Sequence, residues 1–74
     1  MDKIIHIRLK EILQERKIEQ KELAKMTELS TRTISELCNN KSKHIPKEAL
    51  EKISIALNLE SIEQLITFKN DDTN

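Results

Sequence analysis

The chain contains no glycine, valine, tryptophan or tyrosine, and it has one phenylalanine, one proline and one cysteine among 74 residues. Without glycine it cannot form the glycine-rich loops that cradle phosphate groups, so nucleotide-binding enzymes of that kind are excluded. Because aromatic residues are 1% of the chain, the core must consist of Ile, Leu and a few Ala. The missing aromatics, valine and turn glycines favour packed helices over a sheet, and the length allows one small domain.

The remaining scarcities limit the chemistry of the chain. A single cysteine, Cys38, cannot form an internal disulfide, which agrees with a reducing compartment. No apolar run is long enough to span a membrane, and the segment from Met1 to His6 lacks the apolar centre of a secretion signal. Neither His6 nor His44 stands at a metal-ligand spacing from Cys38, and paired carboxylates do not occur in a pocket-like context. We therefore expect a soluble, cytoplasmic protein that is not an enzyme and has no metal site and no cofactor.

Charge is abundant but balanced, because 13 Lys and Arg face 13 Asp and Glu and the net charge is zero. For a nucleic-acid-binding protein this is an objection, since phosphate neutralisation usually leaves a basic surplus. The charges are unevenly spread, however. Between positions 31 and 47 they are Arg32, Lys41, Lys43 and Lys47 against Glu36 alone, whereas after position 59 they are Glu60, Glu63, Asp71 and Asp72 against Lys69. Such a dipolar chain can present one positive face, although ordinary surface charge explains the same pattern.

Apolar residues at helical spacing predict five helices. Ile5, Leu9, Ile12 and Leu13 lie at i, i+4, i+7 and i+8, so they form one stripe of a first helix that ends near Arg16. Similar spacing recurs along the rest of the chain. The buried positions it predicts are Leu23, Ala24 and Thr27 in a second helix that begins near Gln20; Ile34, Leu37 and Cys38 in a third; Leu50, Ile53, Ala56 and Leu57 in a fourth; and Leu65 and Ile66 in a short fifth, with Ile18 and Leu29 packing in the connections.

Capping residues define the ends of these helices. Ser30 is suited to cap the third helix, since its hydroxyl can accept a hydrogen bond from a free N–H of the first turn. Pro46 suits the first turn of the fourth helix, and Asn58 can end that helix in a left-handed conformation. Ser61 with Gln64 three residues later is a capping-box pattern for the fifth. We expect one domain over residues 1–68 and a polar tail over residues 69–74 that frays.

The segment from Gln20 to Leu37 predicts two short helices joined by a tight turn, the second of which begins at the capping serine. This is the layout of a DNA-binding helix-turn-helix. The matching pieces along the chain are Gln20-x-x-Leu-Ala24, Leu29-Ser30, Ile34, Leu37 and Ile45-Pro-x-x-x-Leu50-x-x-Ile53-x-x-Ala-Leu57. In this order and spacing the chain resembles the Xre-like family, the helix-turn-helix proteins of the phage Cro and repressor type, from about Ile7 to Ile66.

The resemblance implies an all-α fold, a compact five-helix lambda-repressor-like domain with its helix-turn-helix in the second and third helices. It also implies a sequence-specific transcriptional regulator, a repressor, whose third helix enters the major groove of double-stranded DNA. Similar proteins usually act as homodimers on palindromic operators, so we expect these partners and neither a membrane nor a small-molecule substrate.

A second function from another class stays open. The same fold can serve as a protein-interaction module, antitoxin-like or antirepressor-like, with weak or no DNA binding. Met26, Ile55, Ile62 and Phe68 are apolar residues that either stay outside the core and form a dimer or partner surface, or complete the core.

The predicted third helix carries four candidates for contact with DNA bases, namely Thr31, Arg32, Ser35 and Glu36. Residues in the first turns of such a helix, on the face away from the core, meet base edges in the major groove. Arg32 can donate two hydrogen bonds to the acceptors of a guanine. Its alternative role is an ion pair with Glu36, but a cation before an anion is the weaker order, and a cation near a helix N-terminus opposes the helix dipole. We therefore expect Arg32 to contact a base or a phosphate.

Five further residues are candidates for contact with DNA phosphates: Gln20, Ser30, Lys41, Lys43 and His44. The resemblance assigns Gln20, at the start of the second helix, to a backbone phosphate, and the free N–H groups of a helix N-terminus favour an anion there. Lys41, Lys43 and His44 lie in the loop after the third helix, where similar proteins touch neighbouring phosphates. A solvated loop is the alternative for these three.

The chain departs from the family pattern at its turns. Similar proteins commonly place glycine after the first helix, in the turn between the second and third, and after the third, where this chain has Lys17, Glu28 and Asn40. Asn40 tolerates a left-handed backbone, but Glu28 in that conformation costs roughly 1 kcal/mol or more. Glu19 stands where threonine often caps the second helix, and it adds a negative charge to the expected phosphate face.

Overall fold

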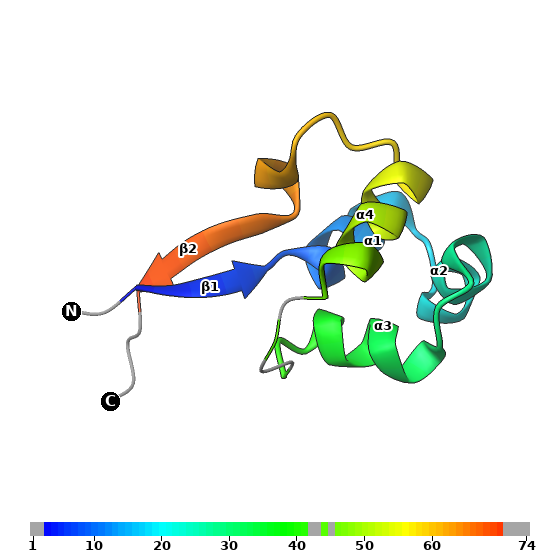
Figure 1. The fold of residues 1–74 in the computed structure, drawn as a ribbon. Helices are drawn as coiled ribbons and strands as arrows, with labels where there is room; N and C mark the ends of the chain where they lie inside the picture. Colours follow the sequence, from blue (N-terminus) through cyan, green and yellow to red (C-terminus); the bar gives the residue numbers. More distant parts are fainter. Residues whose placement is uncertain (1–2, 42–43, 45, 71–74) are drawn as a thin grey trace.

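The computed structural model describes residues 3–41, 44 and 46–70. In chain order this part of the molecule contains β1 (Lys3–Ile7), α1 (Leu9–Arg16), α2 (Gln20–Thr27), α3 (Thr31–Cys38), α4 (Lys47–Ala56), the single 3-10 turn η1 (Ile62–Gln64) and β2 (Ile66–Asn70). The helices pack into one body, and the two strands form a ribbon that projects from it (Figure 1).

One aliphatic core joins the helices to the base of the ribbon, as the composition predicted. Its fully buried large side chains are Leu9, Leu23, Ile34, Leu37, Ile53, Leu57 and Leu65. Thr27 is buried with them and keeps its hydroxyl satisfied by donating to the Leu23 carbonyl oxygen at 2.7 Å. The partly buried Ile18 and Leu29 pack against this core from the connections, which confirms their predicted place.

The prediction of a first helix that includes Ile5 is wrong. Residues Lys3–Ile7 form strand β1, the helix begins only at Leu9, and Ile5 is 47% exposed. Ile5 and Leu9 are four residues apart, as on a helix, but Ile5 and Ile7 also alternate as on a strand. The β-branched isoleucines of this segment favour the extended backbone, and pairing with β2 decides between the two.

The expected fifth helix is also corrected. The capping box is present, since Ser61 Oγ accepts from the Glu63 N–H and Gln64 Oε1 from the Ser61 N–H, both at 3.2 Å. It begins one 3-10 turn, however, after which Leu65 enters the core and the chain becomes strand β2. In place of a five-helix all-α fold, the described residues form four α-helices, one 3-10 turn and a two-stranded sheet.

The sheet is antiparallel, and its register pairs Ile7 with Ile66 at the base and Lys3 with Asn70 at the tip. Residues 69 and 70, predicted to belong to the polar tail, are part of β2. Residues 71–74 lie outside the described part of the chain. Around α4, Asn58 has the predicted left-handed backbone with a φ of 54°, whereas Pro46 caps the helix one position before its first turn.

Candidate nucleic-acid interface

Helices α2 and α3 are joined by residues 28–30, and local hydrogen bonds hold this turn. The Leu29 N–H donates to Thr27 Oγ1 at 3.4 Å while the Leu29 side chain packs against the core. Ser30 caps α3 as predicted, since its Oγ accepts from the Thr33 N–H at 3.1 Å. The direction in which α3 leaves the turn is thus fixed by a partly buried side chain and a capping hydroxyl.

The turn keeps a left-handed residue although the chain has no glycine. Glu28 has a φ of 59°, and Lys17 and Asn40, the other two positions where similar proteins place glycine, have φ values of 56° and 55°. A residue with a Cβ loses about 1 to 2 kcal/mol in this conformation. The chain therefore keeps the turn geometry expected for its fold at some expense of stability.

Helix α3 divides cleanly into a buried and an exposed face. Its Ile34, Leu37 and Cys38 lie in the core, as predicted. The four candidates for base contact lie together on the other side, where Thr31, Arg32 and Glu36 are exposed and Ser35 is partly buried. The exposed face begins in the first turn of the helix, the part that meets base edges when such a helix enters the major groove.

Arg32 and Glu36 form an ion pair, which is the alternative role that the sequence offers for Arg32. Arg32 Nε lies 3.8 Å from Glu36 Oε2, and 88% of the arginine side chain is exposed. An exposed pair of this kind contributes between about 0 and 1 kcal/mol, so the arginine can leave it for a stronger acceptor at little expense. The contact holds the guanidinium over the exposed face of α3.

The candidates for phosphate contact flank α3 on both sides. Gln20 is exposed at the first position of α2, and Ser30, Lys41 and His44 are exposed as well. Lys43 lies outside the described residues. These positions follow from the helix boundaries, which the sequence pattern predicted correctly for α2 and α3.

Acidic residues surround the start of α2. Glu19 is the N-cap residue, and its N–H donates to Glu22 Oε1 at 3.3 Å, so the two glutamates form a capping box. Glu19 Oε2 lies 3.6 Å from Lys21 Nζ, which balances part of its charge. Negative side chains near a helix N-terminus stabilise the helix dipole, but here they also lie next to Gln20, where a phosphate is expected.

A family model described as the Cro/C1-type HTH DNA-binding domain matches residues 8–71. The chain belongs to this family. The match covers all four α-helices, including α2 and α3. It supports a DNA-binding regulator in general, in agreement with the resemblance seen in the sequence. No curated protein matches the chain.

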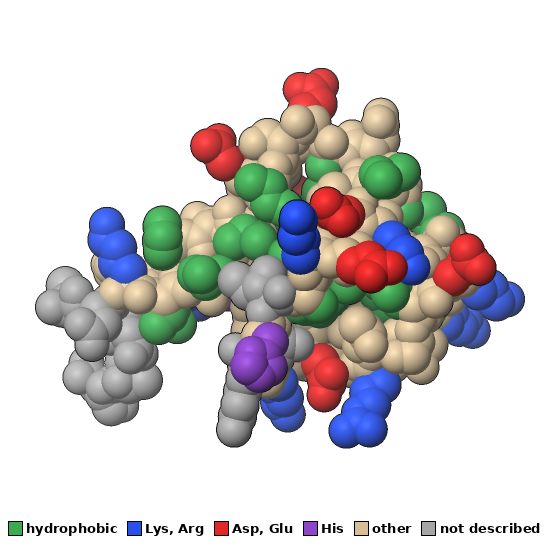
Figure 2. All heavy atoms as spheres, in the orientation of Figure 1, with side chains coloured by type: hydrophobic (Ala, Val, Ile, Leu, Met, Phe, Trp, Pro, Cys, Tyr) green, Lys and Arg blue, Asp and Glu red, His purple; other side chains and the backbone are tan. Residues whose placement is uncertain are grey.

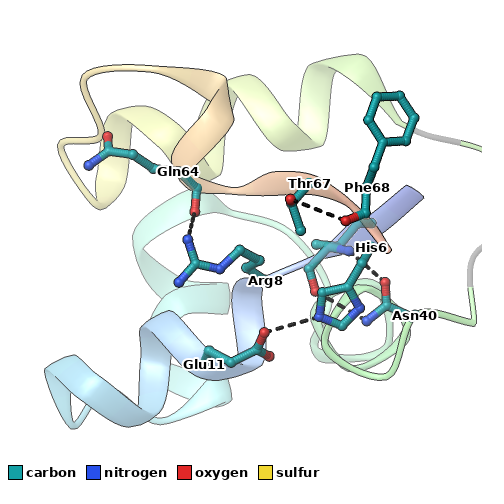
Figure 3. A network of polar contacts seen from close by, with 8 residues as sticks. His6, Arg8, Glu11, Asn40, Gln64, Thr67 and Phe68 are labelled. Atoms are coloured by element: carbon teal, nitrogen blue, oxygen red, sulfur yellow. Dashed lines mark hydrogen bonds and ion pairs between the residues drawn. The ribbon is translucent and has the colours of Figure 1, made fainter. Parts of the chain in front are cut away.

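In this Cro/C1-type domain, Asn40 has a structural role that the sequence pattern did not reveal. Its Oδ1 accepts from the Ile7 N–H at 2.6 Å, and its Nδ2 donates to the Ile7 carbonyl oxygen at 3.1 Å, so the amide pairs with β1 as a neighbouring strand would (Figure 3). Its own N–H donates to the Leu37 carbonyl oxygen at 3.3 Å. The Asn40 side chain thereby ties the end of α3 to the ribbon, which a glycine at that position could not do.

A second polar contact joins the ribbon to α1 in the same region. His6 Nε2 lies 3.0 Å from Glu11 Oε2, and this hydrogen bond lowers the pKa of the Glu11 carboxyl (Figure 3). Burial raises the pKa of the Cys38 thiol, which keeps it protonated and suits its place in the core.

Neither a cluster of metal ligands nor a membrane-spanning helix occurs in the described part of this Cro/C1-type domain. Among residues 3–41, 44 and 46–70, no three side chains of His, Cys, Asp or Glu come together as metal ligands would. Within the same part of the chain, no helix has both the length and the apolar character needed to cross a membrane.

Proposed function

We propose that this chain is a sequence-specific DNA-binding transcriptional regulator, a repressor, that places α3 in the major groove. The observation that carries the proposal is the exposed face of α3, whose candidate base-contacting residues lie together from the serine-capped first turn onward. A protein that occupies an operator blocks access to it without a further surface, so repression is the simplest outcome of binding.

The residues of this face have distinct roles in the proposal. Arg32 leaves its ion pair with Glu36 and donates to O6 and N7 of a guanine. Glu36 accepts from the amino group of a cytosine, and Thr31 contacts a thymine methyl group or a phosphate. Ser35 donates to or accepts from a neighbouring base edge.

The flanking residues hold the helix in place by contacting phosphates. Gln20 extends the anion-binding N-terminus of α2, and the hydroxyl of Ser30 lies at the corresponding end of α3. Lys41, Lys43 and His44 follow α3 and neutralise the phosphates of the adjoining strand. Together these contacts fix the register of α3 on the duplex, while the bases determine the sequence preference.

The proposed DNA-binding unit is a homodimer on a palindromic operator. Two recognition helices related by a two-fold axis fit half-sites whose centres are about 34 Å apart. A single eight-residue helix contacts only a few bases. Dimerisation doubles the number of base contacts.

A second candidate, a protein-interaction module with weak DNA binding, is favoured by the acidic start of α2. Glu19 is exposed beside Gln20, and the chain as a whole has no net positive charge. Both features weaken the attraction of phosphates.

Selection of bound sequences from random duplex DNA at moderate salt distinguishes the two. A palindrome is the expected result, and failure to enrich any sequence would favour the protein-interaction module. On the selected site, Arg32→Ala is expected to lose about 1 to 3 kcal/mol of binding free energy and one base preference. Lys52→Ala on α4, which removes a cation paired with Glu48 at 3.5 Å, serves as the matched control and should bind nearly as the unaltered chain does. If Arg32→Ala loses as much binding free energy on random DNA, Arg32 contacts a phosphate and not a base.

A further inference from the structure

A groove of about 810 Å3 lies between α4 and η1, and its lining is mainly apolar. Ile55 and Ile62, which are 80% and 52% exposed, line it together with the partly buried Leu59 and Ile66. Figure 2 shows hydrophobic side chains around this hollow and acidic side chains close to it. A volume of about 300 to 1,000 Å3 with a largely apolar lining is typical of sites for small organic ligands.

Hydrogen bonds hold the wall of the groove that lies across from α4. The Leu59 N–H donates to the Ser54 carbonyl oxygen at 2.9 Å, which turns the chain back over the end of the helix. The next residue, Glu60, donates its N–H to Gln64 Oε1 at 2.7 Å, and this contact ties the connection to η1. The groove is therefore formed by the backbone of the domain before any ligand enters it, as most ligand sites are.

The rim of the groove carries more negative than positive charge. Glu51 and Glu60 line it with one lysine, Lys47. The ion pairs formed among residues 3–41, 44 and 46–70 involve other carboxylates, so neither glutamate is neutralised by a salt bridge within this part of the chain. Lys47 is the first residue of α4 and lies roughly 12 Å along the helix axis from Ile55. The end of the groove near Ile55 and Glu60 is thus acidic.

One polar atom in the wall of the groove has no hydrogen-bond partner. Ser54 lines the groove, and its Oγ is shielded from solvent without a hydrogen bond to any described residue. A buried hydroxyl in this state is unfavourable, and such groups usually have a partner in a folded protein. A hydrogen-bond donor held in the groove would supply one.

We propose that this groove binds a small organic cation, a compact apolar body that carries one protonated amine. The body covers Ile55, Ile62 and Ile66 and removes their apolar surface from water. The ammonium group lies at the acidic end, where Glu51 and Glu60 attract it more strongly beside an apolar surface than they would in open water. An anion of the same shape meets the same carboxylates and is rejected.

The site is separate from the proposed DNA-binding face. None of the residues that line the groove belongs to α2 or α3, and none is a candidate for contact with bases or phosphates. The inference therefore goes beyond the proposed function and does not depend on it. A chain that selects no DNA sequence can still bind the cation, and a chain that binds no cation can still select DNA.

Two probes with the same body and opposite charge test the proposal, namely protonated adamantylamine and adamantane carboxylate. Each is titrated at neutral pH into the isotope-labelled full chain, and backbone chemical shifts are followed by NMR. The amine is expected to bind with a Kd of about 1 mM, the affinity of a ligand of this size, and the carboxylate at least about tenfold more weakly. The shifts should concentrate on α4, η1 and the residues between them.

Substitutions on the rim separate charge recognition from apolar contact. Glu51→Gln and Glu60→Gln should each weaken amine binding about two- to fivefold, and in the double variant the two probes should bind within about threefold of each other. Ile55→Ser should weaken both probes alike. Glu48→Gln is the matched control, because Glu48 lies on the same helix but outside the groove and pairs with Lys52 at 3.5 Å. Its affinity for either probe should stay within about twofold of the original.

Several results would overturn the proposal. Equal affinity of the unaltered chain for the two probes would remove the recognition of charge, and the absence of saturable shifts up to about 10 mM would remove the site itself. A preference for the amine that survives in the double glutamine variant would place the cation elsewhere. Shifts of the groove residues on dilution of the free chain would show that a second copy covers the groove in place of a small ligand.

Discussion

Replacing Glu28 with glycine is expected to stabilise the chain by about 1 kcal/mol. Glu28 has a φ of 59° and a ψ of 23°, and its side chain is exposed at the turn between α2 and α3. A residue with a Cβ loses about 1 to 2 kcal/mol in the left-handed region, which glycine enters without that loss. Glycine also has more freedom in the unfolded chain, which takes back about 0.4 to 1 kcal/mol. The difference is a net gain of about 0 to 1.6 kcal/mol, with a middle value just below about 1 kcal/mol.

Thermal unfolding followed by circular dichroism, at a fixed protein concentration, measures this gain. For a domain of this length, 1 kcal/mol corresponds to a rise in Tm of about 4 to 8 °C. Glu28→Ala is the control, because alanine removes the carboxylate but keeps the Cβ in the left-handed backbone. It should show no comparable gain. If the alanine and glycine variants are equally stable, charge and not backbone conformation explains the effect, and the reasoning from φ is refuted.

Three further predictions concern the contacts around α3 and the ribbon. Asn40→Gly keeps the left-handed backbone but removes the amide that pairs with Ile7, so it should lower the free energy of unfolding by about 1 to 3 kcal/mol. Asn40→Ala should lose more, because alanine keeps a Cβ in the left-handed backbone. A glycine variant as stable as the original chain would show that the amide does not stabilise the fold. Because His6 lowers the pKa of Glu11, the stability that this contact contributes is present above the unfolded pKa of the carboxyl and is lost as pH falls through the folded one. His6→Ala should therefore flatten the loss of stability in acid, and identical acid unfolding curves would contradict this. Lys41→Ala should weaken binding to all DNA sequences and reduce the slope of log affinity against log salt by about one unit, whereas an unchanged slope would place Lys41 away from the phosphates.

The helices from Gln20 to Leu57 were predictable because each has a local signal. The 3.6-residue period of Leu23, Ile34, Leu37 and Ile53 identifies a buried face without knowledge of the rest of the fold. The exposed face of α3 follows from the same period, which is why the candidate base-contacting residues lie together in the structure. Such a pattern depends only on neighbours a few residues away.

The ribbon was not predictable in the same way because its two strands come from opposite ends of the chain. Ile5 fits both a helical and an extended period, and only its pairing with Phe68 decides between them. The role of Asn40 depends in turn on where β1 runs, since its amide bonds to Ile7. The structure therefore departs from the sequence-based predictions where it arises from contacts between distant segments.

The pairing of the first strand with the last has a consequence for synthesis on the ribosome. Helices α1 to α4 are complete once residue 56 has been made, but β1 has no partner until residues 66–70 have left the exit tunnel. Until then Ile7 of β1 and the core site filled by Leu65 stay exposed to solvent. Closing so long a loop is also slower than forming a helix. Folding is thus completed only when β2 pairs with β1, and a chain released before residue 66 would be a substrate for proteolysis.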